Sequence, residues 1–583
     1  MDQKKFILAV AISLAIMLGY QTFIAPNLPK PAVVAVNQTE QPTPASPAGS
    51  PAAVAQAQLA AGAAEPPNVP RVAIDAPRVR GSISLLGARI DDLVLTDYRE
   101  TLDQGSPFVR LLQRRWKDDP YYVQYGWLPV AGDAVKVPDN DTVWSAPPGA
   151  TLTAKTPVIL SWDNGAGLTF QIEIAVDSDY LFTVKQKVLN ATGQPVKLFP
   201  WSRIRREYKP EVAGYYILFE GLYGVAGGTL KEMKYDDAKS GGEKKQGIAF
   251  ESSGAGGWAG ITDKYWLAAL IPDQAVAQTL NFRHIEVHGD GYQVDYLTQD
   301  GQTAAPGGEA SLASHLFAGA KLVHLLDRYQ DELNLPHFDK AVDFGWFYFL
   351  TKPIFYAIDF LYGLIGNFGL AILAFTVFAK AVFFPLANYS YRSMSKMKLL
   401  GPKVAALRER LKDDPQRMQQ EMMGLYKAEK VNPASGCLPM LVQIPVFFSL
   451  YKVIFVTIEM RQAPFFGWIH DLSVVDPTNV FNLFGLIPFD PTTIPQIGSL
   501  LHLGLWPLMM GVTMFLQQKL NPPPPDPVQA RLFQFMPVIF TFMLANFPAG
   551  LVIYWSWNNL LSIGQQWLIM RRTKLDRPNL ARA

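Results

Sequence analysis

The sequence predicts an α-helical polytopic membrane protein with six transmembrane helices, a large all-β domain outside the cytoplasm and a cytoplasmic helical hairpin. Three observations predict this class. Apolar runs long enough to cross a bilayer occur near the N-terminus and again after residue 344, strand-like alternation fills the region between them, and Lys and Arg gather in only some loops. The composition agrees, because 49% hydrophobic and 17% charged residues with a mean hydropathy of +0.08 describe a membrane part diluted by a polar part.

The charge balance and the cysteine content exclude several classes of protein. The 52 Lys and Arg residues against 50 Asp and Glu residues leave a net charge of +2, so specific nucleic-acid binding is not expected. A single cysteine excludes a disulfide framework and a multi-thiolate metal site. We therefore expect neither a metal nor a cofactor.

The first span is predicted near the N-terminus. Residues 6–24 carry no charge and follow two lysines, and about 20 apolar residues suffice to cross the bilayer core. A cleaved signal peptide is the alternative, but this run exceeds the usual signal core of about 7 to 15 residues, and no clean A-x-A site follows it before Pro26. We assign residues 1–25 to an uncleaved anchor and the Pro- and Ala-rich residues 26–70 to a flexible linker.

The region 71–343 is predicted to be a large β-sandwich. Turn residues separate short alternating runs at 82–86, 168–176, 181–189 and 292–297. A helix at 338–350 is expected to lead from this domain into the membrane. One candidate site is His284, Glu286 and His288, which share a strand face and could bind a metal or a sugar. A polar, solvent-facing strand end is the favoured interpretation of these three residues.

Five further spans are predicted, at residues 367–386, 433–458, 498–518, 532–548 and 549–570. The loop at 387–432 holds ten Lys and Arg residues, whereas the loop at 459–497 holds only Arg461. Because Lys and Arg accumulate on the cytoplasmic side, both termini are expected in the cytoplasm and the region 71–343 outside it. The cytoplasmic segments are then 387–432, 519–531 and the basic tail 571–583.

Residues 387–432 are predicted to form an αα-hairpin, with Asp414 as the N-cap and Pro415 as the first residue of its second helix. The hairpin is rich in cations and in methionines, whose flexible thioethers suit surfaces that meet varied apolar partners. Two interpretations fit this pattern equally well. The hairpin is either a solvated structure without a ligand, or a surface that binds a hydrophobic segment, an anionic lipid or a ribosome. Its candidate residues are Met394, Met397, Lys403, Arg408, Arg410, Met422 and Met423.

Lys380 is the most informative single residue because it lies inside an apolar span, where a charge normally faces water or a partner. No Asp or Glu lies within any of the later spans, which disfavours a buried ion pair. Thr376 lies one helical turn away, and Gln443 and Tyr554 add polar groups from other spans. Helix packing alone explains such polar residues one at a time. Together with an unpaired cation they indicate a hydrated groove that attracts acidic or polar segments.

Several stretches make the chain similar to the YidC-type membrane protein insertases, relatives of the Oxa and Alb insertases. They include FPLANYSYRSMSKMKLLGPKVAALRERLKDD, EMRQAPFFGWIHDLS and WPLMMGVTMFLQQKL, together with residues 420–451 and 533–566. The resemblance implies the Gram-negative form, with a periplasmic β-supersandwich, an amphipathic helix at the membrane interface over 344–366 and a hydrophilic groove facing cytoplasm and lipid. It places Lys380 in that groove and assigns substrate contact to Tyr554 and Trp555.

The predicted function is that of an insertase and chaperone, and we do not expect an enzyme. Nucleotide hydrolysis is not expected because no G-x-x-x-x-G-K-[ST] motif is present. The resemblance implies an inner-membrane location. It also implies, as partners, nascent inner-membrane proteins, the Sec translocon, the lipid bilayer, and a ribosome or targeting factors at the hairpin and tail. Two alternatives remain open from the residues: a transporter whose Lys380 binds an anionic solute, and a membrane-anchored periplasmic carbohydrate-active protein.

Overall fold

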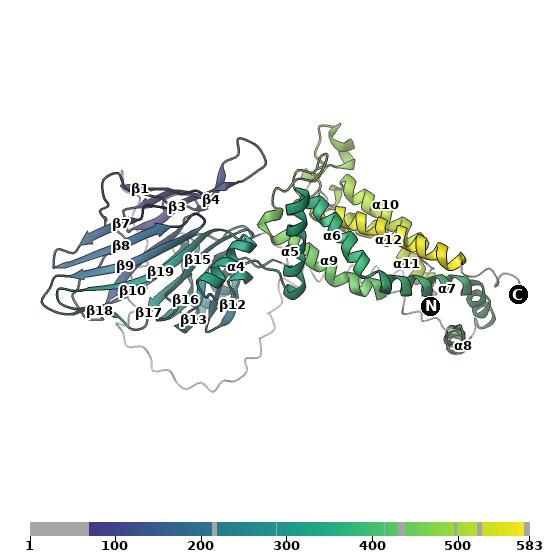
Figure 1. The fold of residues 1–583 in the computed structure, drawn as a ribbon, viewed down its shortest axis with the longest axis horizontal. Helices are drawn as coiled ribbons and strands as arrows, with labels where there is room; N and C mark the ends of the chain where they lie inside the picture. Colours follow the sequence, from purple (N-terminus) through teal and green to yellow (C-terminus); the bar gives the residue numbers. More distant parts are fainter. Residues whose placement is uncertain are drawn as a thin grey trace.

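A β domain and a helical domain lie end to end in the computed structural model (Figure 1). The structure describes residues 69–212, 218–286, 289–412, 414–429, 438–494, 498–521 and 527–575. The predicted anchor at 1–25, nearly all of the linker and the end of the basic tail lie outside these described residues.

Two large, almost wholly antiparallel sheets form the β domain. The 11-stranded sheet has the path β13-β16-β17-β10-β5-β3-β2-β1-β6, with β4 beside β3 and β18 beside β10. Its strands are β1 (Arg71–Asp75), β2 (Val79–Ser84), β3 (Arg89–Arg99), β4 (Phe108–Leu112), β5 (Tyr121–Pro129), β6 (Thr151–Leu152), β10 (Val196–Arg206), β13 (Ile248–Ala255), β16 (Ala277–Glu286), β17 (Asp290–Thr298) and β18 (Gln302–Ala304).

The 8-stranded sheet has the order β12-β11-β14-β15-β19-β9-β8-β7. Its strands are β7 (Val158–Asp163), β8 (Leu168–Val176), β9 (Leu181–Asn190), β11 (Gly221–Ala226), β12 (Thr229–Met233), β14 (Trp258–Thr262), β15 (Trp266–Ile271) and β19 (Glu309–Ala320). Every second residue of β8 is buried, as one-sided packing requires. Trp127 of one sheet meets Phe170 of the other, with ring centroids 5.2 Å apart. The predicted β-sandwich is confirmed.

The chain between the β domain and the helices differs from the single helix predicted at 338–350. Helix α4 (Val323–Glu332) precedes a short 3-10 turn at Phe338–Ala341, and helix α5 begins only at Tyr348. His337 and Gly345 both have positive φ, at 58° and 71°, which a continuous helix does not allow. Helix α5 (Tyr348–Ile365) ends at Gly366, whose φ of 76° provides a left-handed cap. A small helix α3 (Tyr235–Lys244) packs on the β domain.

The helical domain follows α5. Its helices are α6 (Phe368–Val382), α7 (Phe384–Arg410), α8 (Pro415–Ala428), α9 (Leu438–Val456), α10 (Leu505–Leu520), α11 (Pro527–Leu544) and α12 (Ala549–Leu575). The Asn367 side chain accepts a hydrogen bond from the Leu370 N–H, 3.0 Å away, and so caps α6. Asp414 caps α8 in the same way, which confirms the predicted start of the second hairpin helix at Pro415.

Helices α6 and α7 meet at a bend of 67°, beside Phe383. Pro385 has no backbone N–H, so it cannot continue the hydrogen bonding of α6. The span predicted at 367–386 therefore ends earlier as a straight helix, and α7 starts at Phe384, before the predicted hairpin at 387–432. By length and composition, no individual helix of the described chain meets the criterion for crossing a bilayer, whereas α6 and α7 meet it as a bent pair.

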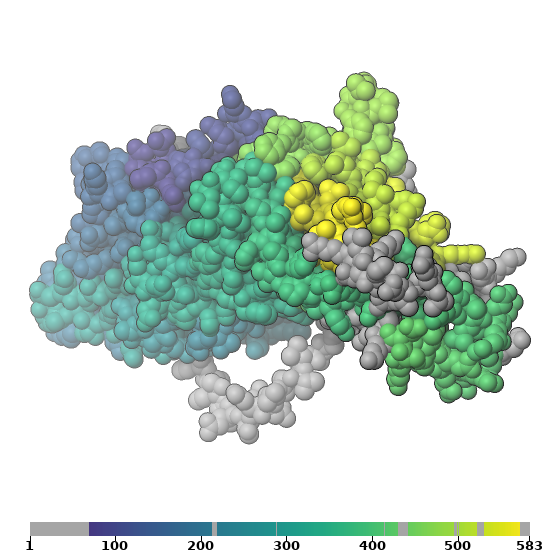
Figure 2. All heavy atoms as spheres, turned by 45° about the vertical axis from the view of Figure 1, so that its right-hand side comes forward, coloured from purple at the N-terminus to yellow at the C-terminus, as the bar shows by residue number. Residues whose placement is uncertain are grey.

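The segment between α9 and α10 bears many exposed apolar side chains. Short 3-10 turns at Val480–Gly485, Pro491–Thr493 and Gly498–Leu501 shape it. Figure 2 shows it in light green, standing out from the helical domain. Its exposed large apolar residues are Phe481, Leu483, Phe484, Leu486, Ile487 and Phe489.

Charged groups join the two domains. Lys452 of α9 pairs with Asp343, with Nζ 2.9 Å from the carboxylate, so its side chain turns toward the β domain. Glu459 accepts a hydrogen bond from the Val323 N–H at 2.9 Å. Arg461 donates to the Arg99 carbonyl oxygen at 2.6 Å. These contacts hold the C-terminal end of α9 against the sandwich.

Candidate functional site

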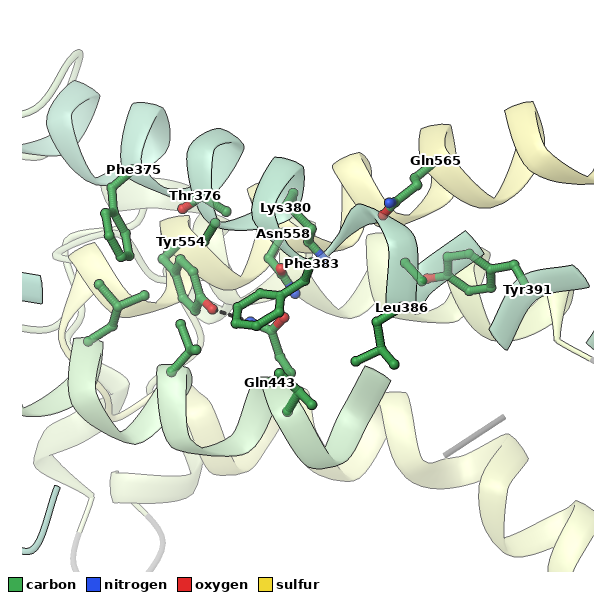
Figure 3. Close-up of a pocket in the computed structure, with 15 residues that line it drawn as sticks. Phe375, Thr376, Lys380, Phe383, Leu386, Tyr391, Gln443, Tyr554, Asn558 and Gln565 are labelled. Atoms are coloured by element: carbon green, nitrogen blue, oxygen red, sulfur yellow. Dashed lines mark hydrogen bonds between the residues drawn. The ribbon is translucent and has the colours of Figure 1, made fainter. Parts of the chain in front are cut away.

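A small cavity lies between α6, α7, α9 and α12 (Figure 3). Three of the predicted groove residues, Thr376, Gln443 and Tyr554, line it together with Lys380. The other lining residues are mostly apolar, and none of the lining residues is acidic. Helices far apart in the sequence thus place one cation and a few polar groups in an otherwise apolar setting.

Lys380 points from the last turn of α6 toward α12. Its Nζ donates a hydrogen bond to Ser562 Oγ at 2.7 Å, and Ser562 Oγ donates in turn to the Asn558 carbonyl oxygen at 2.7 Å. In the described part of the chain, no carboxylate forms an ion pair with Lys380. The predicted unpaired charge is therefore held by a neutral hydroxyl, which leaves the positive charge uncompensated.

Two further predicted residues make defined contacts. Thr376 is 2% exposed, and its hydroxyl donates to the Ile372 carbonyl oxygen at 2.7 Å within α6. The Gln443 side-chain amide donates to the Tyr554 hydroxyl, which ties α9 to α12 across the cavity. Only the second of these contacts links two helices. Thr376 therefore adds a polar side chain to the cavity lining, whereas the hydrogen bond from Gln443 to Tyr554 fixes the distance between α9 and α12.

Trp555 does not line the cavity, although it was predicted beside Tyr554 as a groove residue. Its ring packs against Phe447 and Phe540, with centroids 4.6 Å and 5.9 Å away. Consecutive residues on an α-helix point about 100° apart, so a helix that turns Tyr554 into the cavity turns Trp555 away from it.

The cavity volume is about 40 Å³. A water molecule occupies about 30 Å³ in the liquid, so the space holds on the order of one water. An α-helix with side chains is about 10 Å wide and does not fit. The space beside Lys380 in this structure is therefore too small for a substrate helix.

The hairpin residues separate into two groups. Met394 is 9% exposed and packs with Ala387, Tyr391 and Ile569, while Met397 lies against the same cluster. These two methionines therefore contact α12 instead of presenting a free surface. Met423 is exposed and Met422 half-buried on α8.

Two of the three candidate hairpin cations contact acidic side chains. Lys403 pairs with Glu429 at 3.0 Å, and Arg410 pairs with Glu421, so ion pairs bridge α7 and α8. The side chains of Lys403 and Arg410 are both exposed, and ion pairs between exposed side chains add little stability. Arg408 is half-buried on α7.

The candidate site on β16 differs from its predicted form. His284 is 4% exposed, and its Nε2 lies 2.9 Å from an Asp290 carboxylate oxygen, so it is a buried hydrogen-bonding residue and not part of a solvent face. Glu286 is exposed, and His288 lies outside the described residues. The described residues hold no group of three His, Cys, Asp or Glu side chains arranged to bind a metal.

Sequence reasoning missed Ser562, Tyr391 and Gln565. Tyr391 and Gln565 line the cavity, and Tyr391 also hydrogen-bonds to Ser562. Their signal is spacing: Tyr554, Asn558, Ser562 and Gln565 follow one another at four, four and three residues, which places them on one face of α12.

Family models match both domains. The model described as "YidC periplasmic domain" matches residues 71–357, and the model described as "60Kd inner membrane protein" matches residues 360–577. The two matches meet where the β domain gives way to the helices. They define an inner-membrane protein with a periplasmic β domain.

Similar proteins of known name match this sequence over nearly its whole length. A protein of Granulibacter bethesdensis named "Membrane protein insertase YidC" is 62% identical, with 100% of each chain covered. One of the same name from Acidiphilium cryptum is 55% identical over 88% of this chain and 86% of its own. This chain therefore belongs to the YidC family.

A solved structure titled "Active YidC insertase crystal structure with the first transmembrane domain resolved" is 16% identical to this chain. It covers 86% of this chain and 94% of its own, with a TM-score of 0.35.

Proposed function

We propose that this protein inserts hydrophobic segments of nascent proteins into the inner membrane, and that it also acts as a chaperone for them. The observation that carries the proposal is the lone Lys380 cation in an apolar cavity, in a chain 62% identical to a protein named membrane protein insertase. The relatives give no support to an anionic-solute transporter or to a carbohydrate-active protein.

The proposed topology has six spans with both termini in the cytoplasm. The anchor at 1–25 is the first span, and α5 lies at the periplasmic interface. The bent pair α6 and α7 supplies the second span and the first hairpin helix. Its 67° bend suits a span that ends at the cytoplasmic face and continues as the hairpin. The remaining spans are proposed at 433–458, 498–518, 532–548 and 549–570, and the basic hairpin and tail remain on the cytoplasmic side.

Insertion would proceed without nucleotide hydrolysis. A nascent segment first contacts the exposed apolar and basic surface of the hairpin. Its polar or acidic flank then enters the opened cavity, where Lys380 and the hydroxyl and amide groups replace part of its hydration. The apolar part leaves sideways into lipid, a transfer that gains about 0.8 kcal/mol for each buried CH₂ group. The Sec translocon, a ribosome and targeting factors are the proposed partners.

Reconstitution tests the role of Lys380. Proteoliposomes containing the purified protein receive a single-span substrate with a short acidic periplasmic flank, and protease protection measures insertion. Lys380→Arg keeps the cation and is expected to retain insertion, whereas Lys380→Glu repels the flank and is expected to lower it at least tenfold. Equal insertion by the two variants would refute the electrostatic role.

A further inference from the structure

A second, larger cavity lies where the β domain meets α5 and α9. Its volume is about 800 Å³, within the usual range for small-molecule sites. Strand β12 and the residue after it contribute Leu230, Glu232 and Lys234, and the chain leading into α5 contributes Lys340 and residues 342–348. Helix α9 closes the far side. Figure 1 shows α5 at the end of the helical domain that faces the β domain. In the proposed topology this is the periplasmic end, so the cavity lies there.

The charged lining of this cavity has a surplus of cations. Three lysines face two carboxylates, Glu232 and Asp343. Lys452 is already paired with Asp343, whereas Lys234 and Lys340 form no ion pair with any carboxylate of the described chain. The two remaining ammonium groups stand at a cavity with one remaining carboxylate, so an anion is favoured there.

An apolar track leads away from these cations. Leu441, Ile444 and Phe448 of α9 are 59%, 42% and 44% exposed, and their spacing of three and four residues places them on one face. Phe448 also lines the cavity, so the track starts at the cation-bearing end. Trp346 borders the cavity and is 98% exposed, as expected of an aromatic residue at a membrane interface.

We propose that this cavity binds the headgroup of an anionic glycerophospholipid from the periplasmic leaflet, with an acyl chain lying along Leu441, Ile444 and Phe448. The combination of an anion site and an apolar track fits an amphiphile. A soluble anion would leave the track uncovered, and an uncharged helix would leave Lys234 and Lys340 without a counter-charge. The site is distinct from the Lys380 cavity, and the two cavities share no lining residue.

Photolabelling of the purified full-length protein tests this site. Photoreactive phosphatidylglycerol and photoreactive phosphatidylcholine are compared, and the labelled peptides are mapped by mass spectrometry. Phosphatidylglycerol is expected to label peptides containing residues 340–351 or 441–452 at least fivefold more strongly than phosphatidylcholine does. The double variant Lys234→Glu with Lys340→Glu is expected to lose this preference. Lys231→Glu is the matched control, because Lys231 lies on β12 but does not line the cavity, and it is expected to keep the preference.

A second variant separates the acyl contact from the charge. Phe448→Ser is expected to lower labelling by both lipids while keeping the headgroup preference. Equal labelling by the two lipids in the unmodified protein, or a preference that survives the double charge reversal, would overturn the proposal. So would crosslinking of a photoreactive residue at position 448 to residues 6–24 in place of lipid, because the N-terminal anchor would then be the occupant.

Discussion

Lys380 of α6 and Ser562 of α12 are joined by a hydrogen bond of 2.7 Å across 182 positions of sequence. The hydroxyl holds the ammonium group at the cavity without neutralising it. A carboxylate in the same place would form an ion pair and remove the charge that an acidic substrate flank is proposed to meet.

Removing this hydroxyl tests whether the position of the cation matters. Ser562→Ala leaves the charge but deletes the acceptor, and a net hydrogen bond contributes about 0.5–1.5 kcal/mol. We expect insertion by reconstituted protein to fall about two- to tenfold. Ser556→Ala is the control, because Ser556 is also buried on α12 but bonds only the Val552 carbonyl oxygen. Equal effects of the two substitutions would show that Ser562 does not position Lys380.

Close packing of α10 against α11 depends on Gly511. A Cβ atom at this position would lie 2.0 Å from Thr541 Oγ1, so any side chain separates the two helices. Gly511→Leu is expected to destabilise the protein by about 1–3 kcal/mol, measured as a lower unfolding midpoint in detergent. Gly564→Leu, where a Cβ meets no atom within 4 Å, should change the midpoint little. Similar midpoints for both variants would refute this packing.

The junction between the domains should respond to pH through Glu459. Burial raises the pKa of its carboxyl group from 4.5 to about 7, although the Val323 N–H favours the ionised form. The folded protein then holds a proton that the unfolded chain releases above about pH 4.5. Stability is therefore expected to fall as pH rises from about 4.5 to 7, and to level off above that.

Unfolding midpoints between pH 4.5 and 8 measure this effect. Glu459→Gln cannot ionise, so the difference between its midpoint and that of the unmodified protein isolates the carboxyl group. The control Glu332→Gln, at the end of α4, should show the same pH dependence as the unmodified protein. An unchanged pH dependence in Glu459→Gln would exclude this carboxyl group as the cause.

The strands were predictable because their burial alternates along the chain. The predicted run at 168–176 has the same bounds as β8, since one-sided packing leaves its period directly in the sequence. The helix predicted at 338–350 was wrong, because Gly345 has a φ of 71° and interrupts it, and the apolar residues around this glycine hid its effect. Local capping chemistry did mark the start of α8 at Asp414 and Pro415.

The site was predictable only in part. A charge in an apolar run is visible in sequence, so Lys380 was found. Its partner Ser562 was not, because helix packing decides which of many serines approaches it. Trp555, to which the resemblance assigned substrate contact, does not line this cavity. The small volume of the cavity depends on side-chain packing that no sequence pattern reports.

Crosslinking from the two faces of α6 tests the central claim most directly. A photoreactive amino acid at position 376 faces the cavity, whereas one at position 378 replaces a phenylalanine that is 62% exposed on another face. During synthesis of an inner-membrane protein, position 376 is predicted to crosslink to the nascent chain far more strongly than position 378. Adducts absent from 376, or equally strong from 378, would contradict insertion through this cavity.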